Sequence, residues 1–191
     1  MLKKIIFMGT PLFAVPVLKS LYQNGYPISV VYTQPPQKSN RGMGFNKSPI
    51  QGLSETLNLE VRTPKSIKNN KDEYNYLKKL EADIGIVVAY GQLLPKEILN
   101  LTKKGFINIH ASLLPLWRGS APIERSIMNG DKQTGISFMK ISEKLDTGPI
   151  CNSYSLNILE NENAKSLTER LSLLSAEKIL DEVDLILEDK A

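Results

Sequence analysis

Cysteine and histidine are almost absent from this sequence of 191 residues, which contains only Cys151 and His110. One cysteine cannot form a disulfide within the chain, and the Cys and His clusters that usually bind structural zinc are missing. Every apolar run is also far shorter than the roughly 18 residues that cross a bilayer. The composition therefore excludes a disulfide-rich or membrane-spanning protein and predicts no metal site.

The N-terminus lacks the long apolar core of a signal peptide, because its short run up to Met8 leads at once into Gly9-Thr10-Pro11. We therefore expect a protein of the reducing cytoplasm. Hydrophobic residues make up 41% of the chain and charged residues 23%, as in ordinary globular proteins. The length favours one domain over residues 1–191.

Charge is distributed unevenly along the chain. Residues 160–191 hold nine acidic and four basic residues, whereas residues 1–159 carry a net charge of +9. A basic body favours an anionic ligand or a nucleic acid as partner. A solvated lysine-rich surface is the alternative interpretation, and charge alone does not separate the two.

Hydrophobic patterning predicts an α/β fold. A buried strand over residues 2–8, a helix over 11–24 capped by Thr10, and a second strand over 28–33 form a β-α-β unit, which implies parallel strands. The remaining pattern predicts strands near 60–62, 83–89, 106–110, 135–141 and 150–158, and helices over 49–57, 72–81, 95–99 and 122–129. A mostly parallel sheet of about six or seven strands, flanked by helices, is expected.

The secondary structure of two further segments can be predicted from their composition. Residues 34–47 are polar and lack periodicity, which indicates a long loop. The C-terminal segment is predicted to be an amphipathic helix that begins with a capping box from Ser166 to Glu169.

The turn after the first strand lacks the spaced glycines of a dinucleotide-binding loop, and no P-loop is present.

The segment from Gly105 to Gly119 contains the candidate chemistry. Asn108 and His110 lie two residues apart at the end of a predicted strand, so their side chains point to the same face. Asp146 lies in a turn between two apolar strands. A histidine that satisfies a loop carbonyl and a simple Asx turn are the structural alternatives. Together, an amide, an imidazole and a carboxylate at separate strand ends would suit acyl transfer.

These motifs resemble the formyltransferase family that uses 10-formyltetrahydrofolate. The resemblance rests on Asn108-Ile109-His110, Ser112-Leu113-Leu114-Pro115, Trp117-Arg118-Gly119 and Leu145-Asp146-Thr147-Gly148. The segments Phe7-Met8-Gly9-Thr10-Pro11 and Thr33-Gln34-Pro35, the latter leading to Arg41-Gly42, are similar more narrowly to the methionyl-tRNA formyltransferases.

The resemblance implies a Rossmann-like catalytic domain that transfers a formyl group from 10-formyltetrahydrofolate to the α-amine of methionyl initiator tRNA in translation initiation. It implies catalytic roles for Asn108, His110 and Asp146, and a folate-binding role for Ser112, Leu113, Leu114 and Pro115. Arg41 matches a basic position that contacts the tRNA acceptor end. A monomer without metal is expected.

The sequence departs from that family at two places. Relatives often have Arg-Gly-Lys-Lys where this chain has Arg41-Gly42-Met43-Gly44, and nothing after Ile158 predicts the family's second, tRNA-binding barrel domain. The alternatives are a sugar-amine N-formyltransferase, a formyl-folate hydrolase, and a non-catalytic folate-binding or RNA-binding module.

Overall fold

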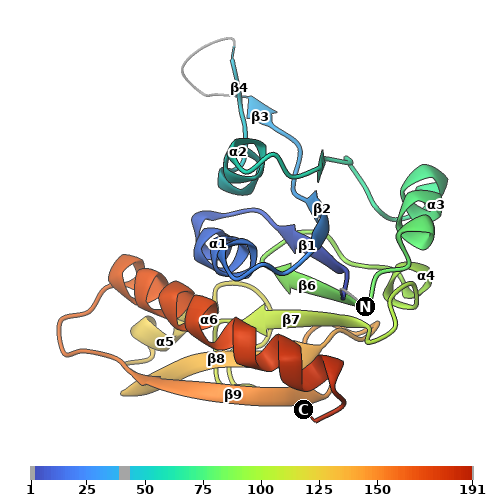
Figure 1. The fold of residues 1–191 in the computed structure, drawn as a ribbon. Helices are drawn as coiled ribbons and strands as arrows, with labels where there is room; N and C mark the ends of the chain where they lie inside the picture. Colours follow the sequence, from blue (N-terminus) through green and yellow to red (C-terminus); the bar gives the residue numbers. More distant parts are fainter. Residues whose placement is uncertain (1–2, 39–43, 191) are drawn as a thin grey trace.

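A computed structural model describes residues 3–38 and 44–190 of the chain (Figure 1). The strands are β1 (Ile5–Gly9), β2 (Ile28–Tyr32), β3 (Gln37–Lys38), β4 (Phe45–Asn46), β5 (Val61–Arg62), β6 (Ile84–Val88), β7 (Phe106–His110), β8 (Gln133–Lys140) and β9 (Ile150–Asn157). The helices are the short 3-10 helix η1 (Leu12–Ala14), α1 (Val15–Gln23), α2 (Pro49–Thr56), α3 (Lys71–Leu80), α4 (Lys96–Leu99), α5 (Pro122–Met128) and α6 (Ala164–Leu187).

The main sheet has seven strands in the order β5-β2-β1-β6-β7-β8-β9. The first five strands of that order pair in parallel, and β8 and β9 are antiparallel to their neighbours. This arrangement confirms the predicted α/β class and the mostly parallel sheet. Parallel strands end at one edge of a sheet, which is where open α/β folds bind ligands.

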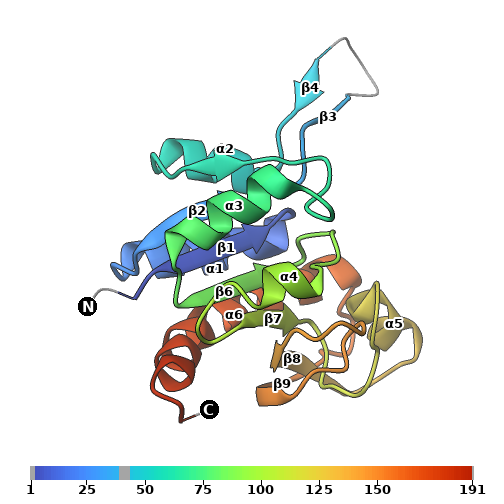
Figure 2. The same ribbon diagram turned by 90° about the vertical axis from the view of Figure 1, so that its right-hand side faces the viewer.

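Helices cover both faces of the sheet (Figures 1 and 2). Ile5 and Phe7 of β1 point into a core with α1 and α6, whereas the alternate residues Ile6 and Met8 join the core under α3 and α4. A strand buried on both sides reads as a continuous apolar run, which is why β1 was predictable from the sequence.

The helix α6 packs along α1 and is tied to η1 and to α1 by one serine hydrogen bond each. Ser172 Oγ donates to the Phe13 carbonyl and Ser20 Oγ donates to the Ala176 carbonyl, each at 2.7 Å. The predicted capping box at Ser166 is wrong, because the N-cap is Asn163, whose side chain accepts from the Ser166 amide at 3.0 Å. Ser166 therefore lies inside the first turn of the helix.

The helix predicted from Pro11 begins later, at Val15, after the turn of η1. Thr10 does not cap it, because its hydroxyl donates to the Tyr90 carbonyl at 2.8 Å. The Thr10 hydroxyl thus bonds to a residue 80 positions away in the sequence and not to the backbone of the helix that follows it.

The polar segment between β2 and α2 contains a short antiparallel pair that the sequence did not predict. Gln37 and Lys38 of β3 pair with Phe45 and Asn46 of β4, and this hairpin projects from the body of the molecule (Figure 1). Among the described helices, none is long and apolar enough to cross a membrane.

Candidate active site

Asn108 and His110 lie on β7, near the middle of the main sheet. Ile107 and Ile109 point into the core with α1 and α6, so Asn108 and His110 face the opposite side. The strand thus brings an amide and an imidazole to one face at the ligand-binding edge. His110 is 7% exposed, and Asn108 is half-buried.

Both nitrogens of the His110 ring face oxygen atoms. The Nε2 atom lies 3.0 Å from the carbonyl oxygen of Trp117. The Nδ1 atom lies 3.8 Å from Oδ2 of Asp146, and both side chains are more than nine-tenths buried. The structure therefore brings the predicted imidazole and carboxylate together. The contact of Nε2 with the Trp117 carbonyl is also the contact with a loop carbonyl that the sequence offered as a purely structural role for His110.

Asp146 reaches the site on a loop that folds back along β7. Lys140, the last residue of β8, pairs with Ile107, and the Ile141 amide donates to the Phe106 carbonyl at 2.8 Å. The loop therefore starts at the far end of β7 from His110. Asp146 thus lies between two strands, as predicted, and the fold-back of the loop is what brings it to His110.

The backbone of Asp146 is in the left-handed region, with φ of 48°. Aspartate and asparagine adopt this conformation more readily than most residues. Its Oδ2 atom accepts a hydrogen bond of 2.8 Å from the Gly119 amide. That bond orients the carboxylate toward His110.

The segment from Ser112 to Pro115 is held by side chains of the antiparallel strands. Ser137 Oγ donates to the Ser112 carbonyl at 2.8 Å and accepts from the Leu114 amide at 3.1 Å. A Cβ atom at Gly135 would lie 2.6 Å from Cδ2 of Leu113, so the missing side chain makes room for that leucine. The segment is thus fixed in place, with Leu114 half-buried and Pro115 exposed.

Three large apolar side chains are exposed in the segments around these groups. Leu93, which follows β6, is 74% exposed, Leu116 is 56% exposed, and Leu145, next to Asp146, is 60% exposed. Exposed leucines beside buried polar groups are typical of a surface that an apolar ligand covers.

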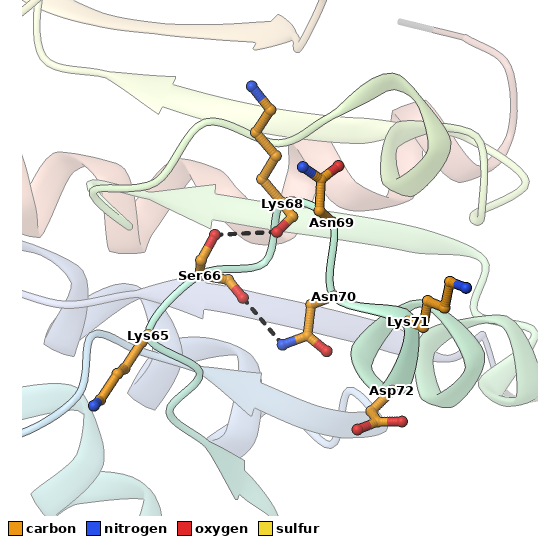
Figure 3. Close-up of a pocket in the computed structure, with 7 residues that line it drawn as sticks. All are labelled: Lys65, Ser66, Lys68, Asn69, Asn70, Lys71 and Asp72. Carbon is orange, nitrogen blue, oxygen red and sulfur yellow. Dashed lines mark hydrogen bonds between the residues drawn. The ribbon is translucent and has the colours of Figure 1, made fainter.

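Arg41 lies outside the described residues. The described part of the chain has another basic element, in which Lys65 and Lys68 lie between β5 and α3 and Lys71 is the first residue of α3 (Figure 3). The three lysines are exposed, and they point in different directions around a shallow hollow. Hydrogen bonds from Ser66 Oγ to the Lys68 carbonyl and from Asn70 Nδ2 to the Ser66 carbonyl fold the segment on itself.

Sequence reasoning missed Asp131 as a neighbour of the site. Its Oδ2 atom accepts from Trp117 Nε1 at 2.7 Å. A half-buried indole needs an acceptor for its N–H group, so the lone tryptophan signalled that a partner exists, but nothing in the pattern identified it. Within residues 3–38 and 44–190, no group of three His, Cys, Asp or Glu side chains could hold a metal ion.

Comparison with known proteins defines the family. The family model described as "Formyl transferase" matches residues 3–183. This chain belongs to the formyl transferase family.

Within the formyl transferase family, the chain is 63% identical over 190 residues to the methionyl-tRNA formyltransferase of Pelagibacter ubique, covering 100% of this chain and 61% of that protein. It is 48% identical to the methionyl-tRNA formyltransferase of Bartonella bacilliformis, covering 93% of this chain and 58% of that protein. The chain thus spans about three fifths of the length of these relatives.

Solved structures with the same fold include a phosphoribosylglycinamide formyltransferase from Bacillus halodurans, with a TM-score of 0.78 and 19% identity, covering 97% of this chain and 94% of that chain. A formyltetrahydrofolate deformylase from Pseudomonas syringae has a TM-score of 0.76 at 19% identity, covering 99% of this chain and 62% of that chain. At these identities the likeness concerns the fold.

Proposed function

We propose that the chain transfers a formyl group from 10-formyltetrahydrofolate to the α-amine of methionyl initiator tRNA. The observation that carries the proposal is the position of His110 close to the Asp146 carboxylate, with Asn108 on the same face of β7. The relatives at 63% and 48% identity, both methionyl-tRNA formyltransferases, support this acceptor.

The formyl donor would supply an activated one-carbon group bound to nitrogen. The leucines of the segment Ser112 to Pro115 and the exposed Leu93, Leu116 and Leu145 fit a flat heteroaromatic ring, because they combine a fixed backbone with apolar side chains. In this proposal the Asn108 amide donates to the formyl oxygen as negative charge develops there. Such a donor is typically worth about 3 kcal/mol in the transition state.

His110 would move the proton. The attacking amine nitrogen forms a bond to the formyl carbon, and the bond from that carbon to the folate nitrogen breaks. The proton that the amine loses passes through His110, directly or by way of water, to the leaving nitrogen. The Asp146 carboxylate stabilises the imidazolium cation in the interval.

A tRNA acceptor requires cationic groups for its phosphates. Lys65, Lys68 and Lys71 follow β5 at the ligand-binding edge, and no ion pair holds any of them among the described residues. Because their side chains diverge, they suit the spaced charges of a nucleic-acid backbone better than one small anion (Figure 3). Arg41 is proposed to contact the acceptor end. The proposal also places the protein in the cytoplasm as a monomer.

A comparison of formyl acceptors, each offered separately, tests the proposed function. The chain is incubated with 10-formyltetrahydrofolate and, in turn, methionyl-tRNA, a sugar amine or water alone, and formylated product and free folate are measured. We expect formylmethionyl-tRNA, formed at least about 10²-fold more slowly by a His110→Ala variant. Preferred formylation of the sugar amine or rapid hydrolysis would show one of the alternative enzymes, and no turnover with folate binding intact would show a binding module.

A further inference from the structure

A chain of contacts links His110 to a carboxylate that lies outside the proposed catalytic group. Asp131 follows α5, and its Oδ2 atom accepts from Trp117 Nε1 at 2.7 Å. Its Oδ1 atom accepts from Asn129 Nδ2 at 2.6 Å, so both carboxylate oxygens are engaged. The Trp117 carbonyl, at the other end of the same residue, lies 3.0 Å from His110 Nε2.

The Trp117 carbonyl determines which nitrogen of His110 carries hydrogen. A carbonyl oxygen only accepts, so the contact at 3.0 Å requires a hydrogen on Nε2. In the neutral ring Nδ1 is then the bare nitrogen, and it faces Asp146 Oδ2 at 3.8 Å. A bare nitrogen and a carboxylate oxygen do not bond, whereas a proton arriving on Nδ1 could be shared between them.

Trp117 needs this support because its backbone is strained. Its φ of 54° lies in the left-handed region, which is uncommon for a bulky residue. A charge-assisted bond from the indole to Asp131 offsets that cost. Without it, we expect the peptide of Trp117 to relax and its carbonyl to turn away from the imidazole.

We infer that Asp131 and Trp117 are positioning residues that hold His110 with hydrogen on Nε2 and leave Nδ1 as the basic nitrogen beside Asp146. The catalytic part of this inference rests on the proposed function, whereas the tautomer is a property of the protein alone. Neither residue contacts the reacting atoms in this scheme.

The sequence makes the tautomer directly measurable. His110 is the only histidine and Trp117 the only tryptophan, so nitrogen-15 NMR of the labelled chain gives one imidazole pair and one indole signal. At about pH 9, where imidazole is ordinarily neutral, we expect a protonated Nε2 and a bare Nδ1. The Asp131→Ala and Trp117→Phe variants should show averaged shifts of two exchanging tautomers.

Activity of the same variants gives the second measurement. We expect Asp131→Ala and Trp117→Phe to lower kcat at least about tenfold with KM for the formyl donor within about twofold, since a misoriented base affects the chemical step. Asp131→Asn should retain the tautomer and most of kcat, because its amide oxygen still accepts from the indole and Asn129 can turn its own amide. Asp181→Ala, on the exposed face of α6, is the matched control.

The outcomes separate the two proposals. A wild-type ring with hydrogen on Nδ1 would overturn the inference, as would an unchanged tautomer in Asp131→Ala when its indole signal has moved. If Asp131→Ala fails to fold, an unchanged tautomer in Trp117→Phe, whose imidazole signals remain readable, would overturn the inference. A chain with the expected tautomer that forms no formylmethionyl-tRNA contradicts the proposed function and leaves the positioning of His110 established.

Discussion

At the scale of single residues, the candidate site depends on backbone positions that neighbours fix. Asn108 and His110 take their common face from strand alternation, whereas Asp146 depends on a left-handed backbone and on the Gly119 amide. Asparagine tolerates the same backbone and accepts the same hydrogen bond, so Asp146→Asn removes the charge and little else.

Replacement of His110 by Ala should lower kcat by about 10² to 10⁴, because proton transfer from the amine loses its carrier. Binding of the folate donor should change little. Asp146→Asn is expected to act in the same direction, and the double variant should be little worse than His110→Ala alone. Single-turnover kinetics with saturating donor measure this effect, and a His110→Ala variant with more than about a tenth of wild-type turnover would exclude the assigned role.

A second prediction at this scale concerns the folate segment. Leu114→Asp should weaken binding of a folate analogue at least about tenfold, since a carboxylate would have to be desolvated against the pterin. The half-buried position and the Ser137 contact of the Leu114 amide should keep the fold intact. Calorimetric titration gives the affinity, with Leu173→Asp on α6 as the control. Equal affinity for the two variants would refute the pocket assignment.

At the scale of elements, one buried carboxylate joins α3 to two strands. Glu73 of α3 is 8% exposed and accepts from Tyr32 of β2 at 2.6 Å and from Arg62 of β5 at 2.7 and 2.9 Å. Burial alone would raise the pKa of Glu73, but the hydrogen bonds from Arg62 and Tyr32 outweigh burial and hold its pKa below the ordinary value. The network fastens the edge of the sheet from which Lys65, Lys68 and Lys71 project.

This network predicts a loss of stability in acid. Because the pKa of Glu73 is lower in the folded state, its contribution to the free energy of unfolding is complete above about pH 4.3, the ordinary value, and is lost as the pH falls below it. Glu73→Gln should cost about 2 kcal/mol at pH 7 and flatten the acid dependence. Urea unfolding at several pH values tests this, with the exposed Glu169→Gln as control. An acid dependence equal to that of the wild type would contradict the assignment.

At the scale of the whole molecule, sequence reasoning predicted the layers better than the contacts between them. The central parallel strands β1 and β6 were predictable because apolar runs such as Ile84–Val88 are buried on both faces. The predicted helix start at Thr10 was wrong because the Thr10 hydroxyl donates to the distant Tyr90 carbonyl instead of capping the helix. The predicted start at Ser166 was wrong because the side chain of Asn163, three residues earlier, caps the helix. The link from His110 through Trp117 to Asp131 was not predictable, since it joins residues by tertiary contact.

The distribution of charge over the molecule predicts that the affinity for the tRNA acceptor falls as the salt concentration rises. If Lys65, Lys68 and Lys71 each neutralise one phosphate, changing all three to Gln should lower the slope of log affinity against log salt by about 2 to 3 for tRNA. Arg41→Ala should reduce kcat/KM for tRNA and leave donor binding unchanged. Filter binding at several salt concentrations measures the slopes, and Lys19, Lys165 and Lys178 changed to Gln serve as control. Equal slopes for the two triple variants would remove these lysines from the tRNA surface.

The fold-back loop of Asp146 gives the site two parts with different local stability. Asn108 and His110 belong to a central strand, and we expect their amides to exchange with solvent only on global unfolding. The loop from residue 141 to 149 is tied to the sheet at its two ends, where the Ile141 amide donates to the Phe106 carbonyl and the Pro149 carbonyl accepts from the Lys140 amide. Between its ends it has its own bonds among Ser142, Lys144 and Thr147, an exposed ion pair from Glu143 to Lys96, and the bond from the Gly119 amide to Asp146. A local opening of this loop would withdraw the carboxylate while the amide and the imidazole stayed in place. The protein could thus lose and regain the proposed third catalytic group without unfolding the sheet.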